Sequence, residues 1–191
     1  MVNLLKDITP RNMQNFKWLN STSFDNLADV GIRMKTPSNT DMFQDPAEQL
    51  NSDSSPFLYL DVTGDFVCTA CVSHHFAYTF DAASILIRSD NRHWAKLCYE
   101  KTDFDTHAIV SVVTNEYSDD ANCVNCHWEK IWLQVIRRGN LFIMNYSFNS
   151  EEWNKVRKFR LNLPSSLCVG MMSQCPLGDG SFMNYHFFSV E

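Results

Sequence analysis

The stretch of sequence that decides the fold is residues 78–120, YTFDAASILIRSDNRHWAKLCYEKTDFDTHAIVSVVTNEYSDD. An apolar run within it ends at Arg88, and after a polar turn the side chains of residues 94–100 alternate between two faces. Residues 107–115 are rich in β-branched side chains. Alternation of period two and β-branched runs are typical of strands. The stretch therefore predicts three consecutive strands joined by turns.

The same pattern continues on both sides of this stretch. Residues 137–140 (RRGN) predict a tight hairpin turn. Regular short strands with turns between them predict a β-sandwich or barrel, and apolar faces opposite mixed faces suit two stacked antiparallel sheets. The fold class predicted is therefore all-β. Further strands are expected at residues 30–35, 66–73, 128–137, 141–148, 158–163, 168–173 and 182–190.

The domain organisation predicted is simple. The chain has 191 residues, a length that a single core still covers. We expect an N-terminal arm at residues 1–15 and one sandwich domain at residues 16–191. Residues 37–56 are polar and contain several prolines, so we expect a long loop there, with one helical turn around residues 46–50.

Composition excludes several classes of protein. The formal net charge of −6 disfavours nucleic acid as a ligand, because an acidic surface repels phosphate. The sequence has no apolar run of the roughly 18 residues that a membrane helix needs, and its first ten residues do not resemble a secretory signal. Seven cysteines without an export signal predict free thiols and a cytoplasmic protein.

Two Cys-x-x-Cys pairs invite a metal hypothesis. Cys68 and Cys71 lie in a predicted strand, where positions three apart point to opposite faces and cannot share a metal. Cys123 and Cys126, followed by His127, lie in a polar segment that we expect to be a loop able to chelate. A fourth ligand is missing, so free loop thiols are favoured, and no metal or other cofactor is predicted.

Catalytic motifs are scarce. The sequence contains no Gly-x-Ser-x-Gly, phosphate-binding Gly-rich loop or His-Glu-x-x-His. Asp103 and Asp105 flank Phe104 in a predicted turn, where solvated carboxylates are the simpler interpretation. We therefore expect a non-catalytic protein, with a glycoside hydrolase using Glu100 and a second acid such as Asp119 as the alternative.

The strand at residues 94–100 carries the candidate ligand-binding face. Trp94, Lys96 and Glu100 share that face, and Arg88 and Ser111 are expected beside them on the neighbouring strands. An indole among charged groups and a hydroxyl is typical of a platform for a sugar or another polar ligand. An exposed face of cross-strand charge pairs around a half-buried Trp94 fits equally well. On the platform hypothesis, Trp94 is partly exposed, and Lys96 and Arg88 keep Glu100 ionised.

Three motifs in fixed order resemble a known family. They comprise Asp81, Ala83, Arg88 and Asp90; then Trp94, Lys96 and Glu100; then Ser111, Val112, Thr114, Asn115, Ser118 and Asp119. Together with the strand containing Trp132, they resemble a family of concanavalin A-like jelly-roll domains of unknown function that includes the yeast cytoplasmic regulator of enolase. The resemblance covers residues 16–190. Ser84 and Phe80 replace a glycine and a tyrosine of the family pattern.

The resemblance implies a two-sheet antiparallel jelly-roll sandwich with a ligand site on the concave face of one sheet. It also implies a regulatory protein linked to carbon metabolism, whose partners are a carbohydrate or small polar ligand and a glycolytic enzyme such as enolase. Exposed aromatic side chains such as Trp128 or Phe182 would anchor the protein partner. The ligand-binding residues expected are Asp81, Arg88, Trp94, Lys96, Glu100, Ser111, Asn115, Asp119 and Trp132.

Overall fold

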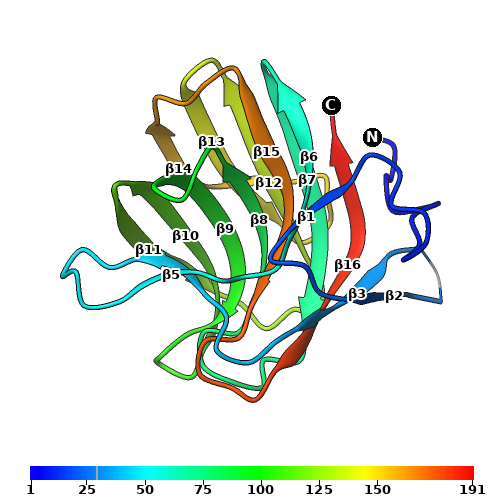
Figure 1. Cartoon of the computed structure of the whole chain (residues 1–191), viewed down its shortest axis with the longest axis horizontal. Helices are drawn as coiled ribbons and strands as arrows, with labels where there is room; N and C mark the ends of the chain where they lie inside the picture. The colour runs from blue at the N-terminus through cyan, green and yellow to red at the C-terminus, as the bar shows by residue number, and fades with distance from the viewer. Residues whose placement is uncertain (29) are drawn as a thin grey trace.

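Sixteen β-strands and no helix make up the part of the chain that the structure describes. The structure is a computed structural model that describes residues 1–28 and 30–191, except for the side chain of His74. Two seven-stranded antiparallel sheets face each other, and a two-stranded hairpin lies outside them (Figure 1). The predicted two-sheet jelly-roll sandwich is thus confirmed.

The first sheet, here called the front sheet, carries the candidate site. Its strands, in spatial order, are β1 (Lys17–Leu19), β6 (Phe57–Thr63), β15 (Ser166–Gln174), β8 (Ala82–Arg88), β9 (His93–Lys101), β10 (His107–Asn115) and β11 (Tyr117–Asn125). The second, or back, sheet has the order β14 (Asn154–Arg160), β13 (Leu141–Ser147), β12 (Ile131–Arg138), β7 (Phe66–His74), β16 (Ser181–Val190), β3 (Ile32–Thr36) and β2 (Phe24–Asn26).

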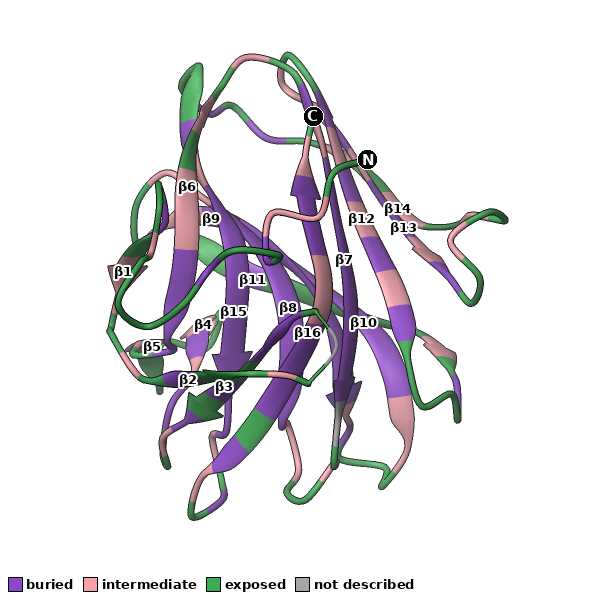
Figure 2. Cartoon of the chain, turned by 90° about the vertical axis from the view of Figure 1, so that its right-hand side faces the viewer, coloured by how far each residue is buried: buried purple, intermediate pink, exposed green. Residues whose placement is uncertain are grey.

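The main hydrophobic core lies between the two sheets, and central strands such as β8, β9 and β15 are mostly buried (Figure 2). On β9, Ala95, Leu97 and Tyr99 face this core, because alternate side chains of a strand share a face. Tyr185 of β16 crosses from the back sheet to the front sheet. Its buried hydroxyl donates to the carbonyl of Met172, at 2.5 Å, and accepts from the amide of Ser84, at 3.0 Å. The phenol thereby connects β15 and β8 to the opposite sheet.

Most of the strands expected from alternation are present. β10 has the predicted bounds, and the turn between β12 and β13 contains Gly139 with a φ of 59°. The strands expected at residues 128–137 and 158–163 have different bounds in the structure, where they are β12 (Ile131–Arg138) and β14 (Asn154–Arg160). Amphipathic alternation is therefore a good guide to strand existence and a poorer guide to strand ends.

Two expectations about irregular segments are wrong. Residues 37–56 are not a long loop with a helical turn: they contain a hairpin of β4 (Met42–Gln44) and β5 (Asn51–Asp53) that lies over the outer face of the front sheet. The polar segment around Cys123 is not a loop, because β11 runs through it and pairs with β10. Both segments have polar sequences because many of their side chains are open to water.

Residues 1–15 contain only an isolated bridge between Thr9 and Asn12 and no longer strand. Leu5 and Ile8 are nevertheless buried in the same core cluster as the sandwich. The amide of Leu4 donates to the carbonyl of Phe188 at 2.8 Å. The expected arm is therefore packed against the sandwich along much of its length. Nowhere in the described residues does a helix occur that has the length and apolar character needed to cross a membrane.

Removing the hydroxyl of Tyr185 tests the link between the sheets. We expect Tyr185→Phe to lower the free energy of unfolding by about 1–3 kcal/mol, because the variant leaves buried backbone groups of β8 and β15 without their partner. Urea denaturation measures the change. Tyr117→Phe, at an exposed tyrosine of β11, is the matched control and should change the free energy by less than about 0.5 kcal/mol. An equal effect of the two variants would contradict the assignment.

Candidate functional site

The outer face of β9 carries the candidate site. Trp94, Lys96, Cys98 and Glu100 share this face, as the alternation predicted, and point away from the core between the sheets. All four are buried nonetheless. Trp94 and Lys96 are buried by the β4–β5 hairpin, which runs across the front sheet and covers part of its outer face (Figure 1), whereas Cys98 packs among neighbouring side chains of the sheet.

Trp94 is fully buried, so the expectation of a partly exposed, ligand-facing indole is wrong. It belongs to a second hydrophobic cluster on the outer face of the front sheet, with Met42 supplied by the hairpin and Leu86 by the neighbouring strand. Its indole N–H donates to the carbonyl of Asn91 at 3.3 Å. Trp94 therefore holds the hairpin on the sheet by apolar contact and offers no stacking surface.

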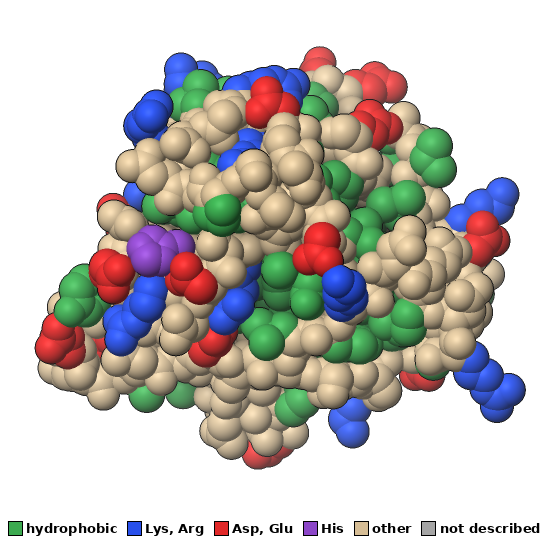
Figure 3. Space-filling model, turned by 45° about the horizontal axis from the view of Figure 1, so that its top comes forward, with side chains coloured by type: hydrophobic (Ala, Val, Ile, Leu, Met, Phe, Trp, Pro, Cys, Tyr) green, Lys and Arg blue, Asp and Glu red, His purple; other side chains and the backbone are tan. Residues whose placement is uncertain are grey.

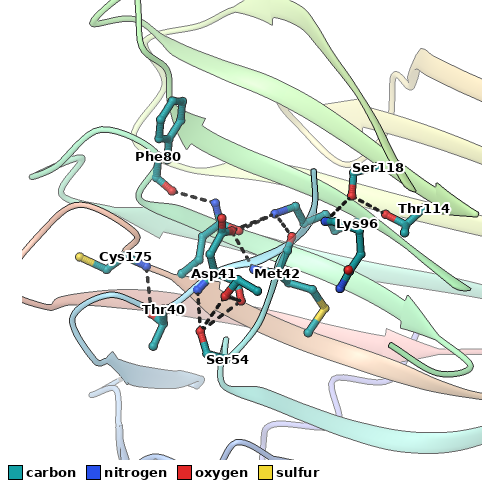
Figure 4. A network of polar contacts seen from close by, with 12 residues as sticks. Thr40, Asp41, Met42, Ser54, Phe80, Lys96, Thr114, Ser118 and Cys175 are labelled. Atoms are coloured by element: carbon teal, nitrogen blue, oxygen red, sulfur yellow. Dashed lines mark hydrogen bonds and ion pairs between the residues drawn. The ribbon is translucent and has the colours of Figure 1, made fainter. Parts of the chain in front are cut away.

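Lys96 is the polar anchor of the hairpin (Figure 4). Its ammonium group is only 2% exposed and donates to the carbonyl of Met42 at 2.8 Å and to the side-chain oxygen of Gln174 at 2.6 Å. A carboxylate oxygen of Asp41 lies 3.6 Å away. A buried charge is tolerated only when it is paired and hydrogen-bonded. The segment around β4 is therefore held at this position by the requirement to satisfy Lys96.

Two further contacts fix the ends of the hairpin. The amide of Gln44 donates to the hydroxyl of Ser118 on β11, at 2.9 Å (Figure 4). At the other end, Arg88 forms an ion pair with Asp53, at 2.7 Å. Arg88 thus binds the hairpin, and the expectation that it pairs with Glu100 is not met.

Beside the hairpin, the outer face of the front sheet is hollowed into a cavity of about 520 Å³, here called the Glu100 cavity. Its walls come from β9, β10, β11, the end of β15, the segment around β4 and the adjoining loops. The residues that line it are Asp41, Phe43, Leu50, Phe80, Lys96, Glu100, Asp103, Phe104, Val110, Val112, Asp120, Asn122, Gln174, Pro176 and Leu177. A pocket of this size with a mainly apolar wall and a few polar groups is typical of small-molecule sites.

Glu100 lies in the cavity wall and is buried, with 7% of its surface exposed. Burial raises the pKa of its carboxyl from the ordinary 4.5 to about 8. The ammonium of Lys96 opposes this shift, whereas the carboxylates of Asp41, Asp120 and Asp103 add to it. The expectation that Lys96 and Arg88 hold Glu100 ionised is therefore wrong, because desolvation outweighs the nearby positive charge. At neutral pH Glu100 is largely protonated.

The remaining predicted residues are dispersed. Ser111 faces the core between the sheets and is paired in register with Leu97, so it does not lie beside Trp94. Asn115 is exposed at the end of β10. Asp119 faces away from the cavity and forms an ion pair with Arg157 of β14 at 2.9 Å.

Asp81 and Trp132 also lie away from the cavity. Asp81 is buried before β8 and accepts a hydrogen bond from the amide of Tyr78 at 3.2 Å. Trp132 belongs to the back sheet, where its ring packs against Phe187 with a centroid separation of 5.2 Å. Of the nine predicted residues, only Lys96 and Glu100 line the Glu100 cavity.

The cysteine pairs have no metal-binding geometry. Cys68 lies in the core and Cys71 on the outer face of the back sheet, as the strand position predicted. Cys123 is exposed, whereas Cys126 is buried and has its pKa raised by burial to about 11. Among the side chains that the structure describes, no group of three or more His, Cys, Asp or Glu could hold a metal ion.

Sequence reasoning missed several cavity residues. Asp120 and Asn122 lie two residues apart on β11 and therefore share a face. This spacing is a signal in the sequence, but the segment around them was expected to be a loop. Gln174 ends β15, in register with Ala82 at the start of β8. Asp41 and Phe43 come from the hairpin, and no local pattern in the sequence indicates that this segment folds back over the sheet.

The fold and the position of the cavity define a concanavalin A-like jelly-roll protein with a hollow on one sheet. The chain belongs to the family described as protein of unknown function (DUF1349), which it matches over residues 18–191. The predicted family resemblance is thus confirmed.

The known proteins that are similar to the chain include two from yeast and one bacterial module. "Regulation of enolase protein 1" from Saccharomyces cerevisiae is 26% identical over 161 residues, which cover 83% of this chain and 80% of the relative. A crystal structure of a functionally unknown protein from Saccharomyces cerevisiae superposes with a TM-score of 0.86 and 24% identity, covering 94% and 97% of the two chains. The carbohydrate binding module CBM66 from Bacillus subtilis has a TM-score of 0.61 and 12% identity, with the same coverage.

The raised pKa of Glu100 predicts a pH dependence of stability. The unfolded chain loses this proton near pH 4.5 and the folded chain near pH 8, so the stabilising contribution of protonated Glu100 is lost as the pH rises through this window. We expect the free energy of unfolding of the native protein to fall, relative to Glu100→Gln, by about 1.4 kcal/mol for each unit of pKa elevation. Denaturant titrations at pH 5 and pH 9 measure the difference.

Glu129→Gln, at an exposed glutamate, is the control for this comparison. It should follow the native protein at both pH values, because Glu129 is exposed and does not line the Glu100 cavity. A Glu100→Gln variant whose pH dependence equals that of the native protein would show that Glu100 titrates normally.

Proposed function

We propose that this chain is a non-catalytic, cytoplasmic regulatory protein that binds a carbohydrate or another small polar metabolite in the Glu100 cavity. On this proposal the bound metabolite modulates a contact with a glycolytic enzyme, and enolase is the partner that we propose. The ligand site lies on the outer face of the front sheet, beside the β4–β5 hairpin.

The observation that carries this proposal is a buried carboxyl group without a partner in a cavity of about 520 Å³. Within the described residues, Glu100 makes no hydrogen bond or ion pair, although only 7% of it is exposed. Burying a polar group without a partner is costly, so such groups are commonly completed by water or a ligand. Protonated Glu100 and the amide of Asn122 can each donate a hydrogen bond, and the carboxylate of Asp120 can accept from a hydroxyl.

The rim of the cavity supports binding of a molecule with an apolar face. Phe104, Leu177 and Leu50 line the cavity and are 75%, 67% and 64% exposed. Apolar side chains around a few polar groups suit the ring of a sugar, which has C–H faces and a hydroxyl edge. The similarity of the fold to a carbohydrate binding module is consistent with this class of ligand.

The regulatory part of the proposal rests on the relationship to a yeast protein named for the regulation of enolase. A candidate contact is the pair Trp128 and Phe148, which are 55% and 38% exposed and stack with a centroid separation of 4.9 Å. Exposed aromatic pairs are enriched among the residues that dominate binding energy at protein interfaces.

Two adjacent aspartates give a sharp test of the ligand site. Asp120 lines the cavity, whereas Asp119 points away from it and binds Arg157. We expect Asp120→Ala to weaken saccharide binding by about tenfold or more, since a hydrogen bond to a charged group contributes roughly 1.5–3 kcal/mol. Asp119→Ala should change affinity by less than about twofold. Isothermal titration of a saccharide panel into the native protein and both variants measures the affinities.

The result also separates binding from hydrolysis. Equal affinities of the two aspartate variants would remove the Glu100 cavity as the site. Release of a reducing sugar from the panel, abolished in Glu100→Gln, would favour the glycoside hydrolase alternative, in which Glu100 is the acid and a neighbouring carboxylate the base.

The partner is tested with purified enolase. We expect a complex that analytical ultracentrifugation detects, and a decrease in its affinity of about tenfold in Trp128→Ala, because truncating an interfacial tryptophan commonly costs more than 1 kcal/mol. The backbone carbonyl of Trp128, which accepts from Tyr99, is retained in this variant. Trp132→Ala, on the outer face of the back sheet, is the matched control. Absence of any complex at micromolar concentrations would refute enolase as a direct partner.

A further inference from the structure

We propose that the ligand of the Glu100 cavity carries a protonated amine, so that the site selects cationic over neutral or anionic molecules. This inference rests on the proposed function and names the class of ligand that the same site takes. Its basis is the arrangement of charges around the cavity. Four acidic side chains and one lysine line it.

The positive charge of the single lysine does not neutralise the negative charge of the cavity lining. The ammonium of Lys96 is buried and is used by Met42, Gln174 and Asp41. Lys96 and Asp41 thus offset each other beneath the hairpin. Two of the three N–H groups of Lys96 are used by Met42 and Gln174, and its charge is paired with Asp41, so Lys96 offers little to an incoming anion.

The other three acids remain without partners. Within the described part of the chain, no hydrogen bond or ion pair reaches the side chains of Glu100, Asp103 or Asp120, all of which line the cavity. Glu100 is more than nine-tenths buried, so its carboxyl group has much less contact with bulk water than a surface group has. Asp103 and Asp120 are exposed carboxylates whose negative charges disfavour ionisation of the buried Glu100, and a cation placed among the three groups relieves this repulsion.

The aromatic wall favours the same kind of ligand. Phe43, Phe80 and Phe104 line the cavity around the carboxyl groups. The face of an aromatic ring attracts a cation, and aromatic side chains combined with carboxylates are a recurring way to bind organic ammonium groups. On the face of the molecule that Figure 3 shows, by contrast, acidic and basic side chains are interspersed.

Binding of a cation has a measurable protonic consequence. Free Glu100 is largely protonated at pH 7, and the charged groups facing it are Lys96 on its own strand, Asp41, Asp103 and Asp120. An ammonium group beside Glu100 favours the ionised carboxylate, so binding transfers the proton of Glu100 to the buffer. A neutral ligand that accepts a hydrogen bond from protonated Glu100 releases no proton.

Three pyranosides that differ only at C6 provide the test. Methyl 6-amino-6-deoxyglucoside, methyl glucoside and methyl glucuronide present an ammonium, a hydroxyl and a carboxylate on the same ring. We expect the 6-amino glucoside to bind at least about tenfold more tightly than the neutral glucoside at low salt, and the glucuronide to bind weakest. Titration calorimetry at pH 7 in two buffers of different ionisation enthalpy measures the protons released on binding. We expect the amine to release up to about one proton and the other two glycosides to release none.

Variants assign this effect to the cavity. Glu100→Gln should abolish proton release and reduce the preference for the amine, whereas Glu129→Gln should retain both. Asp120→Asn, which removes a charge at a more exposed position, should reduce the preference without affecting folding.

The outcomes distinguish the two proposals. Binding of the neutral glycoside as tight as or tighter than the amine would overturn the cationic ligand and leave the carbohydrate site standing. Binding of none of the three glycosides at millimolar concentration would overturn both. Tight binding of the amine without proton release would overturn the role given to Glu100.

Discussion

The buried ammonium group of Lys96 is the constraint on which the outer face of the front sheet depends. A lysine that is 2% exposed in a sheet must be given acceptors and a counter-charge, and the carbonyl of Met42 and the carboxylate of Asp41, both next to or within β4, supply one of each. The hairpin is therefore held over the sheet by an electrostatic requirement as well as by Trp94 and its apolar neighbours. Glu100 lies four residues after Lys96 on the same face of β9, and both residues line the cavity. The cavity therefore lies directly beside the region that the hairpin covers.

Much of the sandwich follows from sequence patterns, whereas the covering of its outer face does not. Strict alternation along β9 correctly placed Trp94, Lys96 and Glu100 on one face. Alternation cannot say what lies over that face, so the exposure of Trp94 and the ionisation of Glu100 were both predicted wrongly. Residues 37–56, which contain the hairpin, are polar because the outward side of the hairpin faces solvent. A polar composition is also typical of loops, so it does not reveal the hairpin.

Strand β10 shows a second limit of sequence reasoning. Its residues are apolar on both faces, so the pattern does not reveal which face carries Ser111, and the register with β9 places that residue opposite Leu97 on the core side. Trp132 illustrates a third limit, since its assignment to the site depended on which of two sheets receives its strand. Residue order can establish that strands exist, but long-range pairing decides which side chains meet. The similarity to other jelly-roll proteins likewise establishes an architecture and leaves the chemistry of the hollow to its own side chains.

The ion pair between Arg157 and Asp119 has a consequence for how copies of the chain behave toward one another. It joins β14 and β11, the outermost strands of the two sheets on the same flank of the sandwich. Outermost strands present unpaired backbone groups that can recruit a strand from another molecule, and charged side chains on them discourage such recruitment. On the opposite flank, Trp18 of β1 packs against Phe24 of β2 and brings those terminal strands together. Both open borders of the sandwich are thus drawn together, which protects the chain against fibril-like self-association.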